Sequence, residues 1–232
     1  MSRKTIYFHH SLLFFAILFF LLVAVAALIF FGVVSIAFAD VGFTPLTIFL
    51  ILLATLAGSF INIPLFKMHS TIPMVHEDHV SWFGIPYKIP HIEYGTATTT
   101  VAINVGGALI PAAVSAYLLA RSSLSLVGLS IIGVLAVMLI THLVARPVKG
   151  VGIATPVFIP PIAAAVVAFI LSPAQPRLVA YVAGTLGTLL GADIWNLGKI
   201  PKLGAPLASI GGAGTFDGVF LTGIIAVLLV GL

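Results

Sequence analysis

Two aspartates, Asp193 and Asp217, are the residues whose type and surroundings most clearly point to chemistry. Both lie in the stretch from Leu189 to Thr222, which reads LLGADIWNLGKIPKLGAPLASIGGAGTFDGVFLT and is apolar around each acid. A carboxylate inside a bilayer costs at least about 2.5 kcal/mol, so an acid in a membrane segment marks a functional site by default. No other acid follows Glu93 in the sequence.

The composition is that of a membrane protein. Of 232 residues, 61% are hydrophobic and 7% are charged, which excludes an ordinary soluble domain. Every backbone polar group in a bilayer must be satisfied internally, so long apolar runs predict helices. Cysteine is absent, which excludes a thiol nucleophile or a thiolate metal site. The formal charge of +4 is attributed to Lys and Arg at helix ends, and nothing indicates a nucleic-acid or nucleotide partner.

The apolar runs predict an all-α fold: one integral membrane domain over residues 1–232, with about seven transmembrane helices. We expect these helices at about 11–38, 46–66, 94–120, 124–145, 151–171, 176 to between 197 and 199, and 212–232. The first run is too long for a signal peptide and is interpreted as a retained helix. The polar segment at about 67–93 is expected to be a loop, with a short hairpin or extended flap over residues 81–90.

The placement of Lys and Arg predicts the orientation. With a cytoplasmic N-terminus, eight basic residues fall in inside segments, namely Arg3, Lys4, Lys67, Lys88, Arg146, Lys149, Lys199 and Lys202. Only Arg121 and Arg177 fall outside. An excess of Lys and Arg marks cytoplasmic loops. We therefore expect the loop with His76 and the connection between the two aspartates inside, and the C-terminus outside.

These boundaries place Asp193 and Asp217 at matching depth, each roughly 6 to 9 Å from the cytoplasmic end of its helix. Antiparallel helices joined by a short loop pack together, and nearby glycines allow close approach. We expect the surroundings of the pair to include Gly191, Asn196, Gly214, Thr215, Phe216 and Gly218. The alternative is that each acid bonds to backbone at a helix end, or pairs with Lys199 or Lys202.

A facing pair of aspartates would share one proton, because two like charges a few Å apart cannot both ionise in a low-dielectric cleft. One carboxylate can then deprotonate a water while the other, protonated, polarises a carbonyl oxygen. This is the chemistry of an aspartic protease, and it requires no cofactor and no metal.

The arrangement of Asp193 and Gly214-Thr-Phe-Asp217 resembles the GxGD intramembrane aspartyl proteases, the presenilin, signal-peptide-peptidase and prepilin-peptidase group. In that group one Asp lies on one helix and a Gly-x-Gly-Asp opens a later one; here Phe216 stands where the motif has its second Gly. The chain as a whole also resembles a family of uncharacterised integral membrane proteins of bacteria and archaea. That resemblance implies a location in the prokaryotic plasma membrane and no particular activity.

The resemblance implies cleavage of transmembrane or membrane-anchored peptides by Asp193 and Asp217. The flap residues Trp82, Phe83, Gly84, Ile85 and Tyr87 are expected to pair with an unwound substrate by strand addition. The alternative is a transporter for small solutes, coupled to protons or cations, in which the same acids bind the ion.

The segment around His76-Glu77-Asp78-His79, with His69, His91 and Glu93, has metal-ligand types at workable spacing. It lacks the HExxH pattern of zinc hydrolases. A solvated polar loop is favoured over a metal site.

Overall fold

The computed structural model describes residues 10–82, 85–149, 152–212 and 218–231, and between residues 72 and 94 it describes the backbone alone. Most of the described chain is helical. The seven α-helices there are α1 (His10–Asp40), α2 (Pro45–Gly58), α3 (Ile110–Ala120), α4 (Leu124–Val144), α5 (Ile159–Leu171), α6 (Pro176–Thr188) and α7 (Gly218–Gly231). Two π-helices, η1 (Val105–Leu109) and η2 (Leu189–Ile194), and a 3₁₀-helix, η3 (Leu197–Leu203), accompany them.

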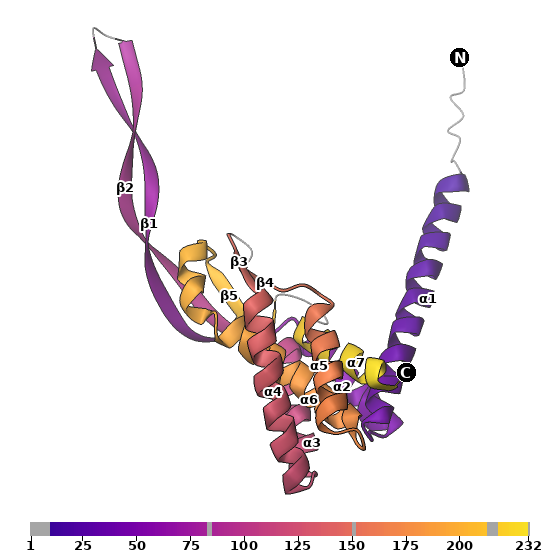
Figure 1. Ribbon diagram of the computed structural model, residues 1–232. Helices are drawn as coiled ribbons and strands as arrows, with labels where there is room; N and C mark the ends of the chain where they lie inside the picture. The colour runs from indigo at the N-terminus through magenta and orange to yellow at the C-terminus, as the bar shows by residue number, and fades with distance from the viewer. Residues whose placement is uncertain (1–9, 83–84, 150–151, 213–217, 232) are drawn as a thin grey trace, which may run out of the picture.

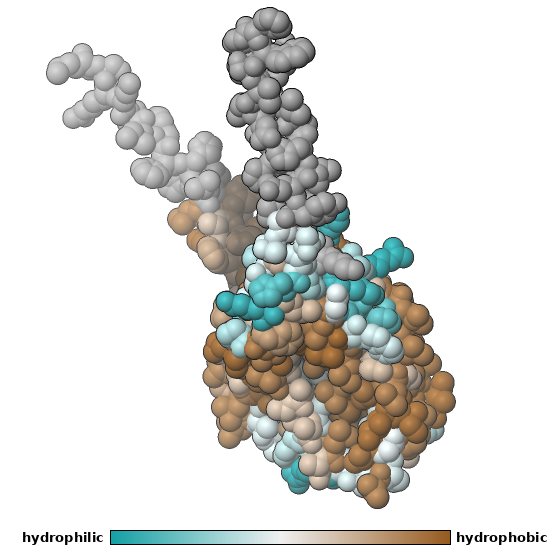
Figure 2. Space-filling view, turned by 90° about the vertical axis from the view of Figure 1, so that its left-hand side faces the viewer, coloured by the Kyte–Doolittle hydropathy of each residue, from teal (hydrophilic) through white to brown (hydrophobic). Residues whose placement is uncertain are grey.

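Within the described residues, three helical segments are long and apolar enough to cross a membrane, at Leu13–Asp40, Leu124–Val144 and Pro176–Ile194. The remaining four apolar helices are shorter. Figure 2 shows apolar side chains covering most of the face in view, with hydrophilic ones gathered where the hairpin leaves the body and a smaller group at the opposite end. A belt of this kind between two polar ends suits a membrane protein.

The all-α prediction was wrong in one respect, because a long β-hairpin projects from the helices (Figure 1). Strands β1 (Asn62–Trp82) and β2 (Ile85–Asn104) pair antiparallel, and β5 (Leu207–Ile210) pairs parallel to β2, in the order β1-β2-β5. Two further short strands, β3 (Arg146–Val148) and β4 (Gly152–Ala154), form a separate antiparallel pair.

The hairpin shifts three predicted boundaries. Helix α2 ends at Gly58 instead of continuing to Phe66, and the next helix begins at Val105 instead of Tyr94. The short flap expected at 81–90 is the outer end of a much longer hairpin. Threonine-rich segments such as 96–100 favour a strand, because β-branched side chains fit a pleated surface. The prolines of β1 and β2 are also compatible with strands, because proline lacks the N–H that a ladder of hydrogen bonds needs. At each of these prolines, the strand has a neighbouring described strand on one side only.

Helix α6 lies at the centre of the bundle, against α4, α5 and α7 (Figure 1). Its contact with α4 depends on glycine, because a Cβ added at Gly187 would lie 2.7 Å from the Cβ of Val137. Helix α1 joins the bundle only near its C-terminal end, where Phe38 packs against Tyr181 and Phe220. The rest of α1 projects away from the bundle (Figure 1). Most of its apolar side chains from Leu13 onward are exposed.

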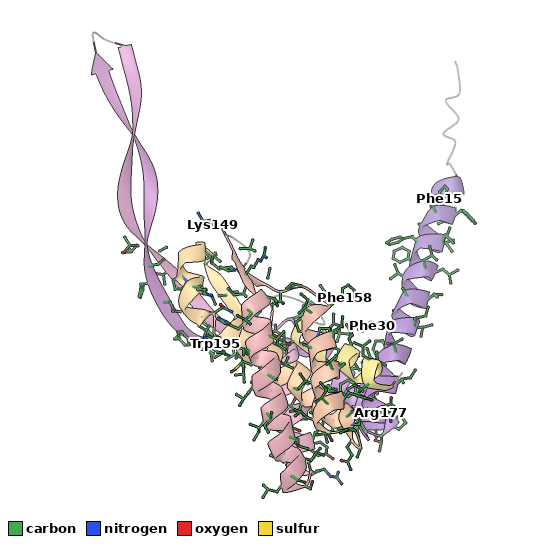
Figure 3. The ribbon with its side chains drawn as sticks, in the orientation of Figure 1. Phe15, Phe30, Lys149, Phe158, Arg177 and Trp195 are labelled. Carbon is green, nitrogen blue, oxygen red and sulfur yellow. The ribbon has the colours of Figure 1, made fainter. Side chains whose placement is uncertain are left out.

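Two basic residues lie toward opposite ends of the bundle. Figure 3 shows Lys149 at the end of the bundle where the hairpin emerges and Arg177 toward the opposite end. Arg177 pairs there with Asp40, with 3.5 Å between Nε and Oδ2. On the hairpin side, β1 and β3 both contact η3, which carries Lys199. The assignment of the hairpin side to the cytoplasm stays a prediction.

Candidate active site

Asp193 lies in the last turn of η2, the π-helix that continues α6. The widened turn is visible in its hydrogen bonding, since Trp195 N donates to Leu190 O at 2.9 Å, a step of five residues. Single π-helical turns within α-helices are rare and occur often at functional sites. The carboxylate is half-buried, and its Oδ2 accepts a hydrogen bond from the backbone N–H of Gly211 at 2.7 Å.

A cavity of about 510 Å³ adjoins Asp193. It is lined by η2, β4, β5, the segment between α2 and β1, and the first residues of α7. Gly212 and Gly218 both line it, and they bracket residues 213–217, which lie outside the described part of the chain. Asp193 therefore shares a cavity with the two ends of the segment that carries Asp217.

Thr188 also lines this cavity, one π-helical step before Asp193. Only 2% of the residue is exposed, and its hydroxyl has no hydrogen-bond partner among the described residues. A buried hydroxyl without a partner costs free energy unless a water or a ligand satisfies it. Thr188 is thus a cavity-lining residue whose hydroxyl is left to bond to a water or a ligand.

Strand β5 presents a free edge to the cavity, because within the described chain it pairs with β2 alone. Thr100 N donates to Pro206 O at 2.9 Å, so the peptide groups of residues 206, 208 and 210 face β2. Successive groups along a strand alternate in direction. The groups of Leu207 and Ser209 therefore face away from β2, as does Gly211 N, which reaches Asp193. Among them, Ser209 O already accepts a hydrogen bond from Gly212 N at 3.3 Å.

Glycines set the position of this edge. Gly211 and Gly212 have φ of +80° and +83°, in the left-handed region that favours glycine. A Cβ added at Gly107 in η1 would lie 1.9 Å from the carbonyl oxygen of Gly211. At Gly191, an added Cβ would lie 2.3 Å from the carbonyl oxygen of Met138 in α4. Close backbone contacts thus hold both ends of the Asp193–Gly211 hydrogen bond.

Asn196 and Trp195 support η2 from its C-terminal side. The fully buried Asn196 amide donates to the carbonyl oxygens of Gly191 and Ala192 at 3.1 and 2.9 Å, while Lys199 Nζ donates to its Oδ1 at 2.8 Å. The Trp195 ring stacks on His142 of α4, with ring centroids 4.4 Å apart. Asn196 therefore caps the helix that carries Asp193, and these contacts fix where that helix ends.

The structure brings together Asp193, Gly191, Asn196 and Gly218 of the expected surroundings. Asp217, Gly214, Thr215 and Phe216 lie outside the described residues. The flap residues are not brought to the site, because Trp82, Ile85 and Tyr87 lie at the far end of the hairpin (Figure 1), and Phe83 and Gly84 lie outside the described residues. Asp193 also lies at the end of its helix and not several residues inside it.

Two contributors to the site were missed from the sequence. Thr188 was hidden in an apolar helix, where a lone threonine gives no signal. Strand β5 is only four residues long and follows Pro206, so it looked like part of a loop. Its small polar Ser209 and the paired glycines after it are the features from which a strand end could have been inferred.

A family model described as a protein of unknown function (DUF1614) matches residues 56–229, about three quarters of the chain. The chain belongs to this family. The matched region holds the hairpin, η2, β5 and every residue that lines the cavity around Asp193, whereas α1 and most of α2 precede it. No curated protein and no solved structure matches the chain.

Proposed function

We propose that the protein is an intramembrane aspartyl protease of the prokaryotic plasma membrane, with Asp193 and Asp217 as its catalytic pair. The observation that carries this proposal is the shared cavity of Asp193, Gly212 and Gly218. Asp217 is the residue before Gly218, and consecutive Cα atoms are about 3.8 Å apart. In this proposal Asp217 reaches the cavity that Gly218 and Asp193 line.

The free edge of β5 supports a peptide as the substrate. An unwound peptide can add to this edge as a further strand, with backbone hydrogen bonds to the N–H and carbonyl of Leu207 and to the N–H of Ser209. Gly211 N, the next group that faces the same side, already holds the Asp193 carboxylate. A peptide bound along β5 would therefore run toward the acid. In this proposal β5 takes the strand-addition role first expected of the flap.

The reaction needs only water and the two carboxyl groups. One carboxylate takes a proton from water, whose oxygen then bonds to the peptide carbonyl carbon, while the other carboxyl gives its proton to the carbonyl oxygen. The C–N bond of the tetrahedral intermediate then breaks, and the amine leaves with the proton that the first carboxylate took from water. A hydroxyl of the intermediate returns its proton to the other carboxylate, which restores the pair. We assign to Thr188 a positioning role, in which its unpaired hydroxyl holds the attacking water beside Asp193.

The test is cleavage of a single-span reporter peptide by the purified full-length protein in lipid nanodiscs. We expect cleavage by the wild type, and loss of cleavage in Asp193→Asn and in Asp217→Asn. Asp40→Asn is the matched control, because Asp40 lies in the Arg177 pair and outside the cavity. Cleavage that survives either of the first two changes would overturn the assignment. Proton or solute flux that depends on Asp193, without cleavage, would favour the transporter alternative.

A further inference from the structure

Polar side chains from three strands lie on one face of the sheet at the base of the hairpin. Asn62 of β1 is opposite Asn104 of β2. Two residues earlier on β2, Ala102 is opposite Ser209 of β5. Residues two apart on a strand share a face, and so do directly opposite residues, so Asn62, Asn104 and Ser209 lie on the same face. Asn62 and Ser209 also line the cavity of Asp193.

The surroundings of Asn104 determine the orientation of its side-chain amide. Gly107 N donates to Asn104 Oδ1 at 2.7 Å, and a backbone N–H can only donate. Asn104 Nδ2 donates to Ser59 O at 2.8 Å, and a carbonyl oxygen can only accept. Because Asn104 is fully buried, the second N–H of Nδ2 also needs an acceptor within the protein. Asn62 Oδ1 lies 3.2 Å from Nδ2 and fills this role.

The amide of Asn62 is oriented in turn. The atom that faces Asn104 must be its oxygen, and Ser209 Oγ donates to the same oxygen at 2.6 Å. The nitrogen, Nδ2, is the other end of the amide and carries two N–H donors. Neither of them donates to a described residue. Asn62 is exposed and lines the cavity, so it brings an unpaired donor there from a position held by two hydrogen bonds.

We propose that Asn62 is a specificity-determining residue, whose Nδ2 binds a carbonyl oxygen on a substrate side chain. This inference rests on the proposed function and adds a residue preference to it. The edge of β5 takes the main chain of an added peptide, whereas Asn62 lies on β1, with β2 between. The main chain is therefore too far away, since neighbouring strands are about 4.8 Å apart. The hydrogen bond to Ser209 nevertheless brings the Asn62 amide next to β5.

A substrate side chain beside Ser209, on the same face, needs only to pass over Ser209 to reach the Asn62 amide. Gln has a long side chain with a carbonyl oxygen at its end. Met is of similar length with only a weak acceptor, and Lys has three donors and no acceptor. A site whose polar group is left unpaired rejects the side chain that lacks the partner. We expect the order Gln, Met, Lys, with about tenfold between Gln and Met for one hydrogen bond.

Asn62→Asp tests the direction of this hydrogen bond. One carboxylate oxygen can still accept from Asn104 and Ser209, so the contacts that hold the side chain remain. The other oxygen replaces the two N–H donors by an acceptor. Lys should therefore move from last place to first, at least tenfold above Met, because a hydrogen bond between charged groups is strong. Asn62→Ala, which removes the amide, should abolish the advantage of Gln over Met without favouring Lys.

Thr155→Val is the matched control. Thr155 lines the same cavity and takes no part in the hydrogen bonds of Asn62. Its loss of a hydroxyl should leave the preference for Gln within threefold of the wild type. A preference lost equally in Thr155→Val and Asn62→Ala would overturn the assignment to Asn62.

The experiment uses the full-length protein in lipid nanodiscs and single-span reporter peptides with Gln, Met or Lys at each residue of the span in turn. Cleavage is followed as kcat/KM. Binding is followed as Kd, by fluorescence anisotropy, in a background with both Asp193→Asn and Asp217→Asn, so that it requires no cleavage. We expect the Gln preference at one substrate position in both measurements, and the Lys preference at the same position once Asn62→Asp is added.

The outcomes separate this inference from the proposed function. Binding that prefers Gln, and prefers Lys once Asn62→Asp is added, would support the role of Asn62 even if the wild type cleaves no reporter, a result that overturns only the protease. Cleavage with equal kcat/KM for Gln, Met and Lys at every position would overturn the role of Asn62 and leave the protease standing. A Gln preference that Asn62→Asp leaves unchanged would also overturn it, because Asn62 would then only join β1 to β5.

Discussion

The Asp193 carboxylate accepts a hydrogen bond from the backbone N–H of Gly211, with 2.7 Å between Oδ2 and N. The bond joins the last turn of a π-helix to the residue that follows β5, 18 residues further along the chain. Asp193 is thereby held at one end of a strand edge that faces a cavity. This relationship joins an acid to the end of a strand, at a cavity that the first residue of α7 also lines.

Asp193→Asn should separate structure from catalysis. The amide oxygen of Asn can still accept the Gly211 N–H, so we expect the folded state to change little. Asn cannot take a proton from water, and cleavage should fall by about a thousandfold or more, as for other general bases. Thermal unfolding together with cleavage of the reporter measures both effects. If activity falls only in step with stability, the carboxylate has a structural role alone.

Thr188→Val should weaken the reaction without disturbing the packing of the helix. Valine has the shape of threonine and lacks the hydroxyl, which has no partner among the described residues, so its loss should not destabilise the fold. We expect kcat to fall about tenfold if the hydroxyl holds a water, with KM unchanged. Thr188→Ser restores a hydroxyl and should recover most of the rate. Equal rates in the Val and Ser variants would remove Thr188 from the mechanism.

Gly107→Ala should destabilise the protein and also reduce activity. The added Cβ would lie 1.9 Å from Gly211 O, so η1 and the end of β5 must move apart. Overpacking of this kind costs about 1 to 3 kcal/mol, which corresponds to a fall of about 5 °C in Tm for a chain of this size. Gly128→Ala in α4 is the control, because nothing lies within 4 Å of its added Cβ. A Tm for Gly107→Ala equal to that of the control would contradict the contact.

The sequence alone predicts the helices of this fold better than its β-hairpin. The seven helices occur in the predicted order, because long apolar runs such as Leu124–Val144 have no other stable form in a membrane. The hairpin was underestimated, since the apolar segment after Gly58 and the threonines before Asn104 were absorbed into neighbouring helices. A strand of this kind is decided by its partner, and the pairing of residues 62 and 104 is not visible in either segment alone.

The candidate site was also only partly predictable from the sequence. Asp193 stands out because a carboxylate in apolar surroundings is costly. Its hydrogen bond to Gly211 depends on β5, which in turn depends on the parallel pairing with β2. Three segments far apart in the sequence must therefore meet before the strand edge exists.

A proline scan of the substrate should reveal whether a peptide adds to β5 as a strand. Proline lacks the N–H that a ladder needs, and only alternate residues of an added strand face their partner. We therefore expect cleavage of reporters with single prolines to alternate with a period of two residues on the side of the scissile bond that lies along Leu207 and Ser209. Alanine at the same positions is the control. Cleavage that tolerates proline at every position along this stretch would exclude strand addition. Cleavage that is lost at every position would indicate that proline acts by something other than a missing strand hydrogen bond.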